Sequence, residues 1–253
     1  MSDVLEITAQ RVHGFFRVPG PNDDKYSRGV VQFVTGSEQY PGAAVLGIAG
    51  AFGIGPGMVR YAGAARTLVL THFPEVVCQL GRSAVSVIGS GWGEDLVEHA
   101  LQAEAPCVVL DAGAMEREEL RHMGGTLVLT PHHGEAARLL HCSRSEVADN
   151  PLRSARALQE RFDAIVVLKG SATWVVGEQE WCFEAPSHWA ATAGAGDVLA
   201  GAIGAAIAAS PATVEEAVVA AVWAHGSAAY STKPMRAMAI ADELPAKVEA
   251  IAV

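Results

Sequence analysis

The stretch ATAGAGDVLAG (residues 191–201) places three glycines around one acid, Asp197, directly before an apolar run that continues to residue 209. Glycine loses more backbone freedom on folding than any other residue, so Gly194, Gly196 and Gly201 indicate that another group comes close to the backbone. A glycine loop that leads into a helix also leaves N–H groups unpaired at the positive end of the helix dipole, which favours anion binding. Asp197 is compatible with two roles, a helix cap or the acceptor of a proton from a hydroxyl.

The composition predicts a protein with a large core and a small-molecule ligand. Of the 253 residues, 50% are hydrophobic and 18% are charged, which allows a sizeable core. The formal net charge of -10 argues against general nucleic-acid binding and against attachment to an anionic membrane. An anionic small ligand is still compatible with this charge, because a local nest of backbone N–H groups can hold it.

Several features of the chain predict a cytoplasmic, water-soluble protein. The N-terminal stretch MSDVLEITAQRVHG carries acids early and lacks an apolar segment, so no signal peptide is expected. The longest apolar run, residues 198–209, is too short and too rich in Gly and Ala to span a bilayer. The four cysteines lie far apart without a CxxC pair, as in proteins with ordinary reduced thiols.

Short β-rich runs alternate with helix-like stretches along the whole chain. The runs are continuously apolar rather than alternating, which is typical of strands in a sheet that is covered on both faces. The alternation predicts a mainly parallel α/β sheet with right-handed crossovers and with ligands beyond the carboxyl ends of its strands. Strands are expected at residues 29–35, 67–72, 84–89, 107–113, 126–130 and 164–170, a hairpin at 173–183, and helices after residue 41 and at 94–105, 134–140, 151–162, 197–209, 214–230 and 242–251.

Two further strand-to-loop junctions carry residues that suit a ligand, although each also has a plain structural explanation. TGSEQYPGAAV (residues 35–45) has a turn after a strand and Pro-Gly before a helix, as in an ordinary joint between the two. VVLKGSAT (residues 166–173) offers the charge of Lys169 and the free N–H groups of a turn to a phosphate. A β-turn with a solvated lysine fits that stretch nearly as well.

The junction LTPHHGEAARLL (residues 129–140) places two histidines and an acid at the start of a helix. Adjacent residues point in different directions on regular structure, so His132 and His133 are not expected to chelate a metal. Glu135 favours the helix N-terminus electrostatically, and the junction suits contact with a substrate better than a metal. The chain lacks a P-loop motif, but the four junctions together fit one nucleotide site and one acid–base residue.

The order of these motifs, with GIGPGMVR at residues 53–60, closely resembles the ADP-dependent NAD(P)H-hydrate dehydratases of the ribokinase-like superfamily. The resemblance runs from about residue 28 to about residue 229, and LTPHHGE and ATAGAGDVLAG are its most specific pieces. It implies a three-layer α/β sandwich with a mainly parallel central sheet and helices on both faces. It also implies that residues 1–253 form a single dehydratase domain without the epimerase domain that usually accompanies it.

The resemblance implies repair of a damaged cofactor: hydrated NADH or NADPH (NADHX or NADPHX) loses water, with ADP as co-substrate and Mg²⁺ as cofactor. Asp197 is then the catalytic base on the ring hydroxyl, next to the anion hole at the glycine loop. The implied contacts to the hydrated cofactor are Ala43, Gly91, His132 and Asp197. The implied contacts to the nucleotide are Lys169, Gly170, Ser171, Ala172, Thr173, Gly194 and Gly196, and no residue is assigned to a metal.

The chain departs from the family pattern at several positions. GSGWG (residues 89–93) has Ser90 and Trp92 where the family has Pro and Leu, so that Trp92 can reshape the substrate pocket. DAGAM (residues 111–115) has lost the second acid of the family motif at Gly113. Pro56 replaces a usual Ala, and SHWAATAG (residues 187–194) differs from the usual entry to the glycine loop. The anion hole and Asp197 are kept, so the chain is expected to be active.

Two alternative functions stay open at this point. A kinase of the same superfamily would transfer the γ-phosphoryl of ATP to a vitamin or sugar alcohol, but the TPHHGE junction argues against it. A catalytically idle nucleotide-binding protein is also compatible with the changes at Trp92 and Gly113. A homo-oligomer is expected, and the Ala-rich stretch at residues 217–230 suits either the core or a subunit interface. Functional pairing with a separate epimerase is a further expectation.

Overall fold

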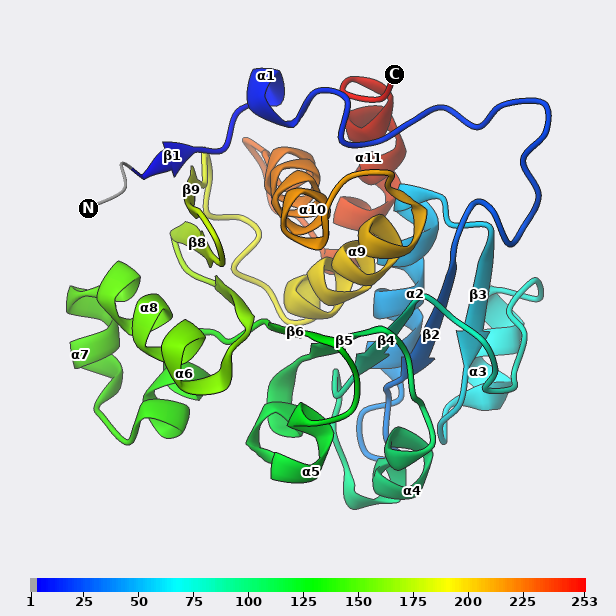
Figure 1. The fold of residues 1–253 in the computed structure, drawn as a ribbon, viewed down its shortest axis with the longest axis horizontal. Coiled ribbons are helices and arrows are strands. Elements are labelled where there is room, and N and C mark those ends of the chain that lie inside the picture. The colour runs from blue at the N-terminus through cyan, green and yellow to red at the C-terminus, as the bar shows by residue number, and fades with distance from the viewer. Residues whose placement is uncertain (1–3) are drawn as a thin grey trace.

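The computed structural model describes residues 4–253, which form a nine-stranded sheet between two layers of helices (Figure 1). The first three residues of the acidic N-terminal stretch lie outside this range. The strand order is β1-β9-β8-β7-β6-β5-β4-β2-β3, and only β8 among the described strands runs against the others. The strands are β1 (Leu5–Glu6), β2 (Val30–Val34), β3 (Met58–Tyr61), β4 (Val85–Ile88), β5 (Cys107–Leu110), β6 (Thr126–Leu129), β7 (Ile165–Leu168), β8 (Ala172–Val176) and β9 (Glu180–Glu184).

The helices divide into two groups, one on each face of the sheet. Successive side chains of a strand point to opposite faces, so that Val87 and Val109 join one core while Ile88 and Leu110 join the other. The first core includes α2 (Gly42–Ile54), α9 (Ala195–Ala209), α10 (Val214–Ala228) and α11 (Ala237–Glu249). The second includes α4 (Val97–Leu101), α5 (Glu118–Arg121), α6 (His133–Leu140), α7 (Arg144–Asp149) and α8 (Pro151–Phe162). The expected three-layer arrangement is confirmed.

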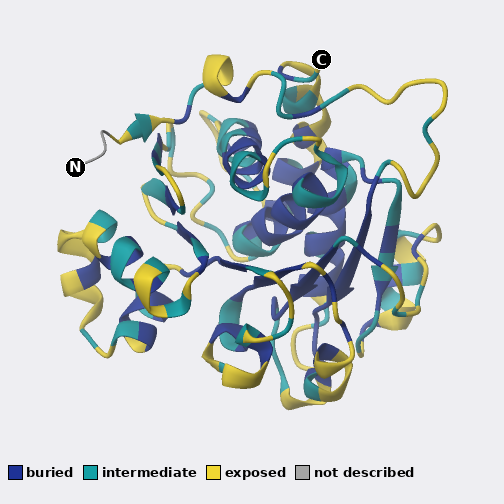
Figure 2. Cartoon of the chain, in the orientation of Figure 1, coloured by how far each residue is buried: buried dark blue, intermediate teal, exposed yellow. Residues whose placement is uncertain are grey.

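The pair α2 and α9 lies deep in the first core, where Figure 2 shows almost continuously buried ribbon. A methyl group on Gly201 would overlap the carbonyl oxygen of Gly47, and one on Gly50 would overlap that of Val198. The two helices therefore touch backbone to backbone. Gly201 is a packing glycine of this crossing, and the group that comes close to its backbone is the carbonyl of Gly47.

The Ala-rich stretch at residues 217–230 also belongs to this core. Its helix α10 packs on α9 and α11, and most of its side chains are buried. The shorter α1 (Ala9–Val12) contacts α10 from outside. Of the two positions left open for this stretch, the structure supports the core.

Residues 67–72 were expected as a strand but form the helix α3 (Arg66–His72). Only Val69 of this segment is fully buried. A strand covered on both faces would bury most of its side chains, whereas a surface helix buries only those on one side. The start of the helix is held by Tyr61, whose hydroxyl accepts a hydrogen bond from the N–H of Ala65 and donates one to the carbonyl of Thr35. The sheet edge beside β2 is occupied instead by β3, which was not expected.

Two other elements differ from expectation in their extent. The helix expected at residues 94–105 is a 3-10 turn at Glu94–Leu96 followed by α4, which ends at Leu101. Helix α11 begins at Ala237 rather than residue 242, and it accommodates Pro245 within its length. The remaining expected strands and helices are present, with boundaries that shift by only a few residues, as in the 3-10 helix Ala112–Glu116 that follows β5.

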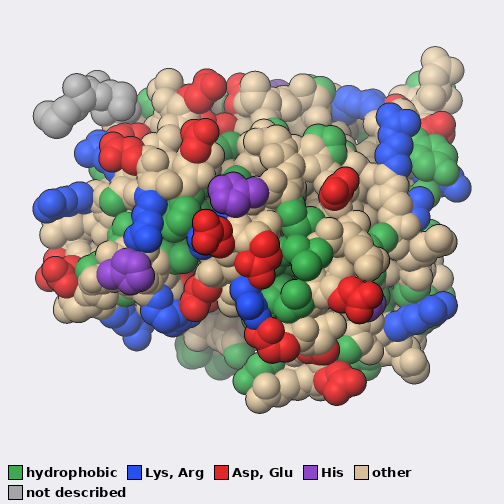
Figure 3. Space-filling model, turned by 60° about the horizontal axis from the view of Figure 1, so that its bottom comes forward, with side chains coloured by type: hydrophobic (Ala, Val, Ile, Leu, Met, Phe, Trp, Pro, Cys, Tyr) green, Lys and Arg blue, Asp and Glu red, His purple; other side chains and the backbone are tan. Residues whose placement is uncertain are grey.

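One face of the molecule carries charged side chains of both signs (Figure 3). On the face drawn in Figure 3, acidic side chains are interspersed with basic ones. The four cysteines are free. Within residues 4–253, none of the helices has the length and apolar character that crossing a bilayer requires.

Replacement of Gly201 by Ala is expected to lower the free energy of unfolding by about 3 kcal/mol, because α2 and α9 must separate to admit the methyl group. The matched control is Gly42→Ala at the first residue of α2, where a methyl group meets nothing within 4 Å. That variant is expected to change stability by no more than about 1 kcal/mol. Denaturant unfolding followed by circular dichroism measures both, and equal effects would contradict the backbone contact.

Candidate active site

The predicted junctions meet at the carboxyl edge of the sheet. The loop after β2 contacts the loop after β4, since the N–H of Gly36 donates to Ser90 O at 2.8 Å and that of Ser37 to Gly91 O at 3.0 Å. The ends of β6 and β7 are joined in the same way, with the N–H of Lys169 donating to Pro131 O at 2.8 Å. Parallel strands bring these loops together, as expected for a site of this fold class.

His132 and Glu135 form a capping box at the start of α6. The Nδ1 atom of His132 accepts hydrogen bonds from the N–H groups of Gly134 (2.9 Å) and Glu135 (3.1 Å), and Glu135 Oε2 accepts one from the N–H of His132 (2.8 Å). This confirms the expected stabilising role of Glu135 at the helix N-terminus. It also assigns the proton of a neutral His132 to Nε2, on a side chain that is 55% exposed.

Lys169 is mostly buried, and its ammonium group forms an ion pair with Asp111, with Nζ 2.8 Å from Oδ1. A methyl group on Gly196 would lie 3.3 Å from the same nitrogen. The ammonium therefore lies beside the glycine loop, and the alternative of a solvated lysine on a plain turn is wrong. Burial alone would lower the pKa of Lys169, but the charge of Asp111 outweighs it and raises that pKa above its ordinary value.

Asp111 belongs to this site, although sequence reasoning gave it no role. Its Oδ1 accepts hydrogen bonds from Lys169 and from Thr130 Oγ1 (2.7 Å), and its Oδ2 accepts one from Ser90 Oγ (2.8 Å). Burial alone would raise the pKa of Asp111, but the charge of Lys169 and these hydrogen bonds hold it below its ordinary value. The available signal was the acid that DAGAM retains at the end of a strand.

Asp197 is the third residue of α9 and does not cap it. The N-cap is Gly194, with φ of 91° in the left-handed region, and within residues 4–253 the Asp197 side chain has no hydrogen-bond partner. Burial raises the pKa of Asp197 to about 7, the nearby Asp111 and Glu135 add to the shift, and Lys169 opposes it. A carboxyl group with this pKa exchanges its proton near neutral pH, as a general base requires.

A cavity of about 730 Å³ opens beside Lys169 and the start of α9. Six of the predicted residues line it: His132, Lys169, Gly170, Ser171, Thr173 and Gly196. The other predicted residues, Ala43, Gly91, Ala172, Gly194 and Asp197, do not line it. Ala172 lies in β8, and the side chain of Leu46 in α2 occupies the place of a methyl group on Gly194.

The lining of this cavity combines basic and apolar side chains. Arg144 and Lys169 carry positive charges, and Phe183, Leu199, Val222 and Ala229 are apolar. Sequence reasoning assigned neither Arg144 nor His225 to it. The Nε2 of His225 lies 3.0 Å from Ala195 O, and burial lowers the pKa of His225 to about 4, so the ring is neutral at pH 7.

Ala43 and Gly91 lie next to each other, on the far side of Asp111 from the cavity. A methyl group on Gly91 would lie 2.6 Å from Ala43 Cβ, and Gly91 has φ of 64°. Ser90 connects this pair to the rest of the site, because its hydroxyl donates to Asp111, which in turn holds Lys169. The structure thus connects the two predicted ligand regions through one carboxylate.

The two departures from the family pattern fit each other. A side chain at Gly113 would meet the indole of Trp92, with a methyl group 2.7 Å from Cδ1 and 3.0 Å from Cγ. The guanidinium of Arg117 lies over the same indole, 5.8 Å from its centroid. Trp92 therefore occupies the space that the second acid of the family motif would need.

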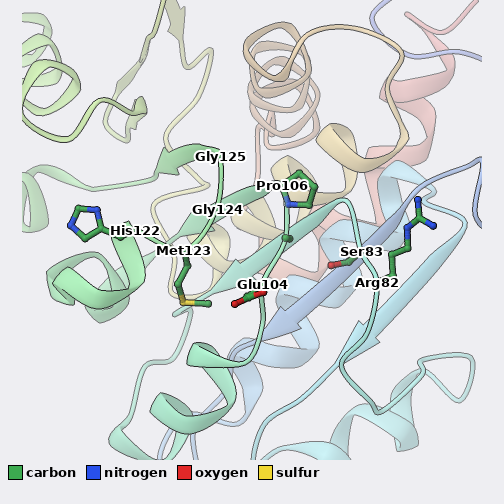
Figure 4. A pocket seen from close by; sticks show the side chains of 9 residues that line it. Arg82, Ser83, Glu104, Pro106, His122, Met123, Gly124 and Gly125 are labelled. Atoms are coloured by element: carbon green, nitrogen blue, oxygen red, sulfur yellow. The ribbon is translucent and has the colours of Figure 1, made fainter.

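A second cavity, of about 610 Å³, lies at the opposite, amino edge of the sheet (Figure 4). Its lining residues directly precede β4, β5 and β6, with Arg82 and His122 at opposite sides. The hydroxyl of Ser83 is buried there without a partner among the described residues. None of the predicted site residues lines this cavity, so the proposed chemistry is assigned to the carboxyl edge.

The strand order and the two helical layers are those of the ribokinase-like α/β fold, the fold class expected from the sequence. Within that class, the chain belongs to the NAD(P)H-hydrate dehydratase family, whose model matches residues 31–249.

Three similar proteins illustrate this membership. An ADP-dependent (S)-NAD(P)H-hydrate dehydratase of Neisseria meningitidis is 34% identical over 251 residues, which cover 88% of this chain and 83% of that protein. The bifunctional NAD(P)H-hydrate repair enzyme Nnr of Mycobacterium leprae is 39% identical over 232 residues, which cover 85% of this chain. The chain spans about half the length of that relative, 48%. The ADP/ATP-dependent NAD(P)H-hydrate dehydratase from Bacillus subtilis, crystallised with ATP and Mg²⁺, has a TM-score of 0.88 at 25% identity, covering 98% and 99% of the two chains.

Introduction of the family's acid by Gly113→Asp is expected to destabilise the protein by about 1–3 kcal/mol, because the new side chain displaces Trp92. Trp92→Leu should relieve the clash, so the double variant should be more stable than the sum of the two single effects. Denaturant unfolding of all four proteins gives the coupling energy. Additive effects would show that the two positions are independent.

Asp197→Asn is expected to stabilise the protein increasingly as the pH rises. The ordinary pKa of 3.8 applies to the unfolded chain, and the folded state binds the proton up to about pH 7, so wild-type stability falls between these values. The gain from the variant should be near zero below pH 4 and reach at most about 4 kcal/mol above pH 7. Thermal unfolding from pH 4 to pH 8 measures it, with the exposed Asp242→Asn on α11 as control. A gain that is independent of pH would contradict the raised pKa.

Proposed function

We propose that this chain removes water from hydrated NADH or NADPH in an ADP-dependent reaction that restores the reduced cofactor. The observation that carries this proposal is Asp197, a partly buried carboxyl group with a pKa of about 7 beside the Lys169 ammonium and the start of α9. Membership in the NAD(P)H-hydrate dehydratase family and the names of its relatives supply the reaction class.

In the proposed reaction Asp197 accepts the proton of the ring hydroxyl as the hydroxyl oxygen attacks the β-phosphoryl group of ADP. AMP leaves, and the phosphate ester that forms then loses inorganic phosphate from one ring carbon and a proton from the adjacent carbon to water, which restores the double bond of the dihydronicotinamide ring. The oxygen of the lost water thus leaves in the phosphate. The free N–H groups at the start of α9 and the Lys169 ammonium would stabilise the charge that develops on the phosphoryl group.

The cavity suggests how the nucleotide lies. Its apolar residues, such as Phe183 and Val222, suit a purine, and its basic residues Lys169 and Arg144 suit phosphates. Residues Lys169, Gly170, Ser171, Thr173 and Gly196 are the proposed nucleotide contacts within it, with Ala172 and Gly194 as supporting backbone. The hydrated cofactor would lie toward Ala43, Gly91 and His132, with Asp197 between the two ligands.

Mg²⁺ fits this site as an ion that enters with the nucleotide. Residues 4–253 contain no group of three or more His, Cys, Asp or Glu side chains that could hold a metal. Mg²⁺ commonly keeps several waters and binds through substrate phosphates with one or two carboxylates. It would spread the charge of the phosphates, while the residues described above position the hydroxyl and its base.

The cellular setting is proposed from weaker support. Four free cysteines fit a reducing compartment such as the cytoplasm. The match covers 83% of the Neisseria relative, whose name gives the dehydratase activity alone. Pairing with an epimerase activity is suggested by the bifunctional name of the Mycobacterium relative. Assembly into a homo-oligomer stays a prediction.

The test follows the recovery of reduced-nicotinamide absorbance when the purified protein is given hydrated NADH, Mg²⁺ and ADP or ATP. Recovery with ADP is expected, together with AMP and phosphate in equal amounts. Asp197→Ala should abolish turnover and leave the Kd for ADP within about a factor of three, because the carboxyl group acts on the hydroxyl. Asp242→Ala, on the exposed face of α11, is the matched control and should keep full activity.

The other outcomes separate the alternatives. Loss of both turnover and ADP binding in Asp197→Ala would assign Asp197 a structural role. ADP binding without recovery by the wild-type protein would favour an idle nucleotide-binding protein. Consumption of ATP only with a vitamin or sugar alcohol would favour a kinase.

A further inference from the structure

Asp111 is the most completely engaged side chain of the site, yet neither the motifs nor the proposed reaction uses it. Its side chain is 4% exposed, and both of its oxygens accept hydrogen bonds, from Lys169 and Thr130 on one and from Ser90 on the other. These donors follow β7, β6 and β4, and Asp111 itself follows β5. One carboxylate therefore joins the ends of four adjacent strands.

A contribution to stability does not by itself explain why this site contains a buried ion pair between Asp111 and Lys169. Desolvation of two charges offsets most of their attraction, and a well-packed apolar pair is often as stable as a buried ion pair. The pair does, however, determine where the Lys169 ammonium lies. Within residues 4–253, Lys169 has a carboxylate within 4.0 Å only at Asp111, although the charges of Glu135 and Asp197 are close enough to raise its pKa.

Three charged groups act on the ionisation of Asp197, and one neutral histidine contacts the start of its helix. Asp111 lies at the end of β5, Lys169 at the end of β7, and Glu135 in the first turn of α6. His225 of α10 is neutral, and its Nε2 donates a hydrogen bond to the carbonyl of Ala195, two residues before Asp197. Lys169 is thus the one cation among these groups. Because its ammonium pairs with Asp111, it is not available to form an ion pair with Asp197.

We propose that Asp111 is a positioning residue that holds the Lys169 ammonium beside Gly196 and prevents it from pairing with Asp197. The role rests on the proposed function and refines it: Asp111 contacts neither ligand and acts through Lys169. Thr130 and Ser90 orient the carboxylate, so that one ammonium proton points at Asp111 and the others are left for the nucleotide phosphate at the start of α9.

Two electrostatic changes follow if the charge of Asp111 is removed. The repulsion that Asp111 exerts on the ionised Asp197 disappears, and the Lys169 ammonium becomes available to pair with Asp197. Both changes favour the ionised form of Asp197, so its pKa falls. A base with a lower pKa accepts a proton less readily, and turnover at neutral pH falls with it.

The decisive variant is Asp111→Asn, which keeps the size and the acceptor oxygen but removes the charge. Its first readout does not depend on turnover: the carboxyl ¹³C resonance of Asp197 is titrated by NMR and assigned by its loss in Asp197→Asn. The midpoint is expected to lie about 1 pH unit or more below that of the wild-type protein. In the enzyme assay the acid limb of the kcat/KM profile should move down by the same amount.

Two further variants serve as controls. Glu180→Gln breaks the ion pair of Glu180 with Arg156, a part-buried pair at distances of 2.6 Å and 2.7 Å, and should leave the Asp197 midpoint unchanged. The double variant Asp111→Asn/Lys169→Met removes the freed cation, so the midpoint should return toward or above the wild-type value. It also replaces both charges of the buried pair, and therefore gives a folded protein to measure if Asp111→Asn alone does not fold.

An unchanged or higher Asp197 midpoint in Asp111→Asn would overturn the proposal, as would a double variant whose midpoint stays as low as that of the single variant. If the wild-type protein dehydrates no hydrated cofactor but the NMR midpoints move as expected, the reaction assignment fails and the positioning role stands. If turnover occurs and the midpoints do not move, the positioning role alone fails.

Discussion

The backbone contact between α2 and α9 is the constraint on which the rest of the site depends. Because Gly201 lies against Gly47, the two helices approach more closely than any larger residue would allow. Gly47 also lies near the carbonyl of Asp197, with 3.5 Å between that oxygen and the position of a methyl group on the glycine. The close crossing of α2 and α9 therefore fixes the position of Asp197 relative to the sheet. Leu46 of the same helix fills the space beside Gly194, which fixes the entry of the chain into α9.

Near the start of α9, three carboxyl groups and one ammonium group lie close together and are largely buried. Asp111 and Lys169 satisfy each other, Glu135 is engaged by the backbone at the start of α6, and Asp197 is left without a partner. An unpaired, partly buried carboxyl group lowers stability at neutral pH, a cost that proteins commonly retain at functional sites. The carboxylate of Asp111 thus has a structural role, whereas that of Asp197 is free to exchange a proton.

The sequence allowed prediction of most of the fold and part of the site. Strands β2, β4, β5, β6 and β7 were predictable because continuous apolar runs are rare outside covered parallel sheets. Residues 66–72 have a similar local pattern but form α3, since their position outside the sheet leaves only Val69 to bury. Motif order identified Asp197, Lys169 and His132, but not Asp111, whose partner Lys169 is 58 residues away.

The sequence by itself determined most of the strands and helices, the glycine loop before α9 and the presence of one acid directly after it. These depend on residue type and spacing within a few neighbours. The tertiary structure decided which carboxylate takes the Lys169 charge, which glycine serves packing rather than ligand approach, and that Trp92 fills the space above Gly113. Those outcomes depend on distances between segments far apart in the chain, and it is the crossing of helices over a parallel sheet that sets such distances.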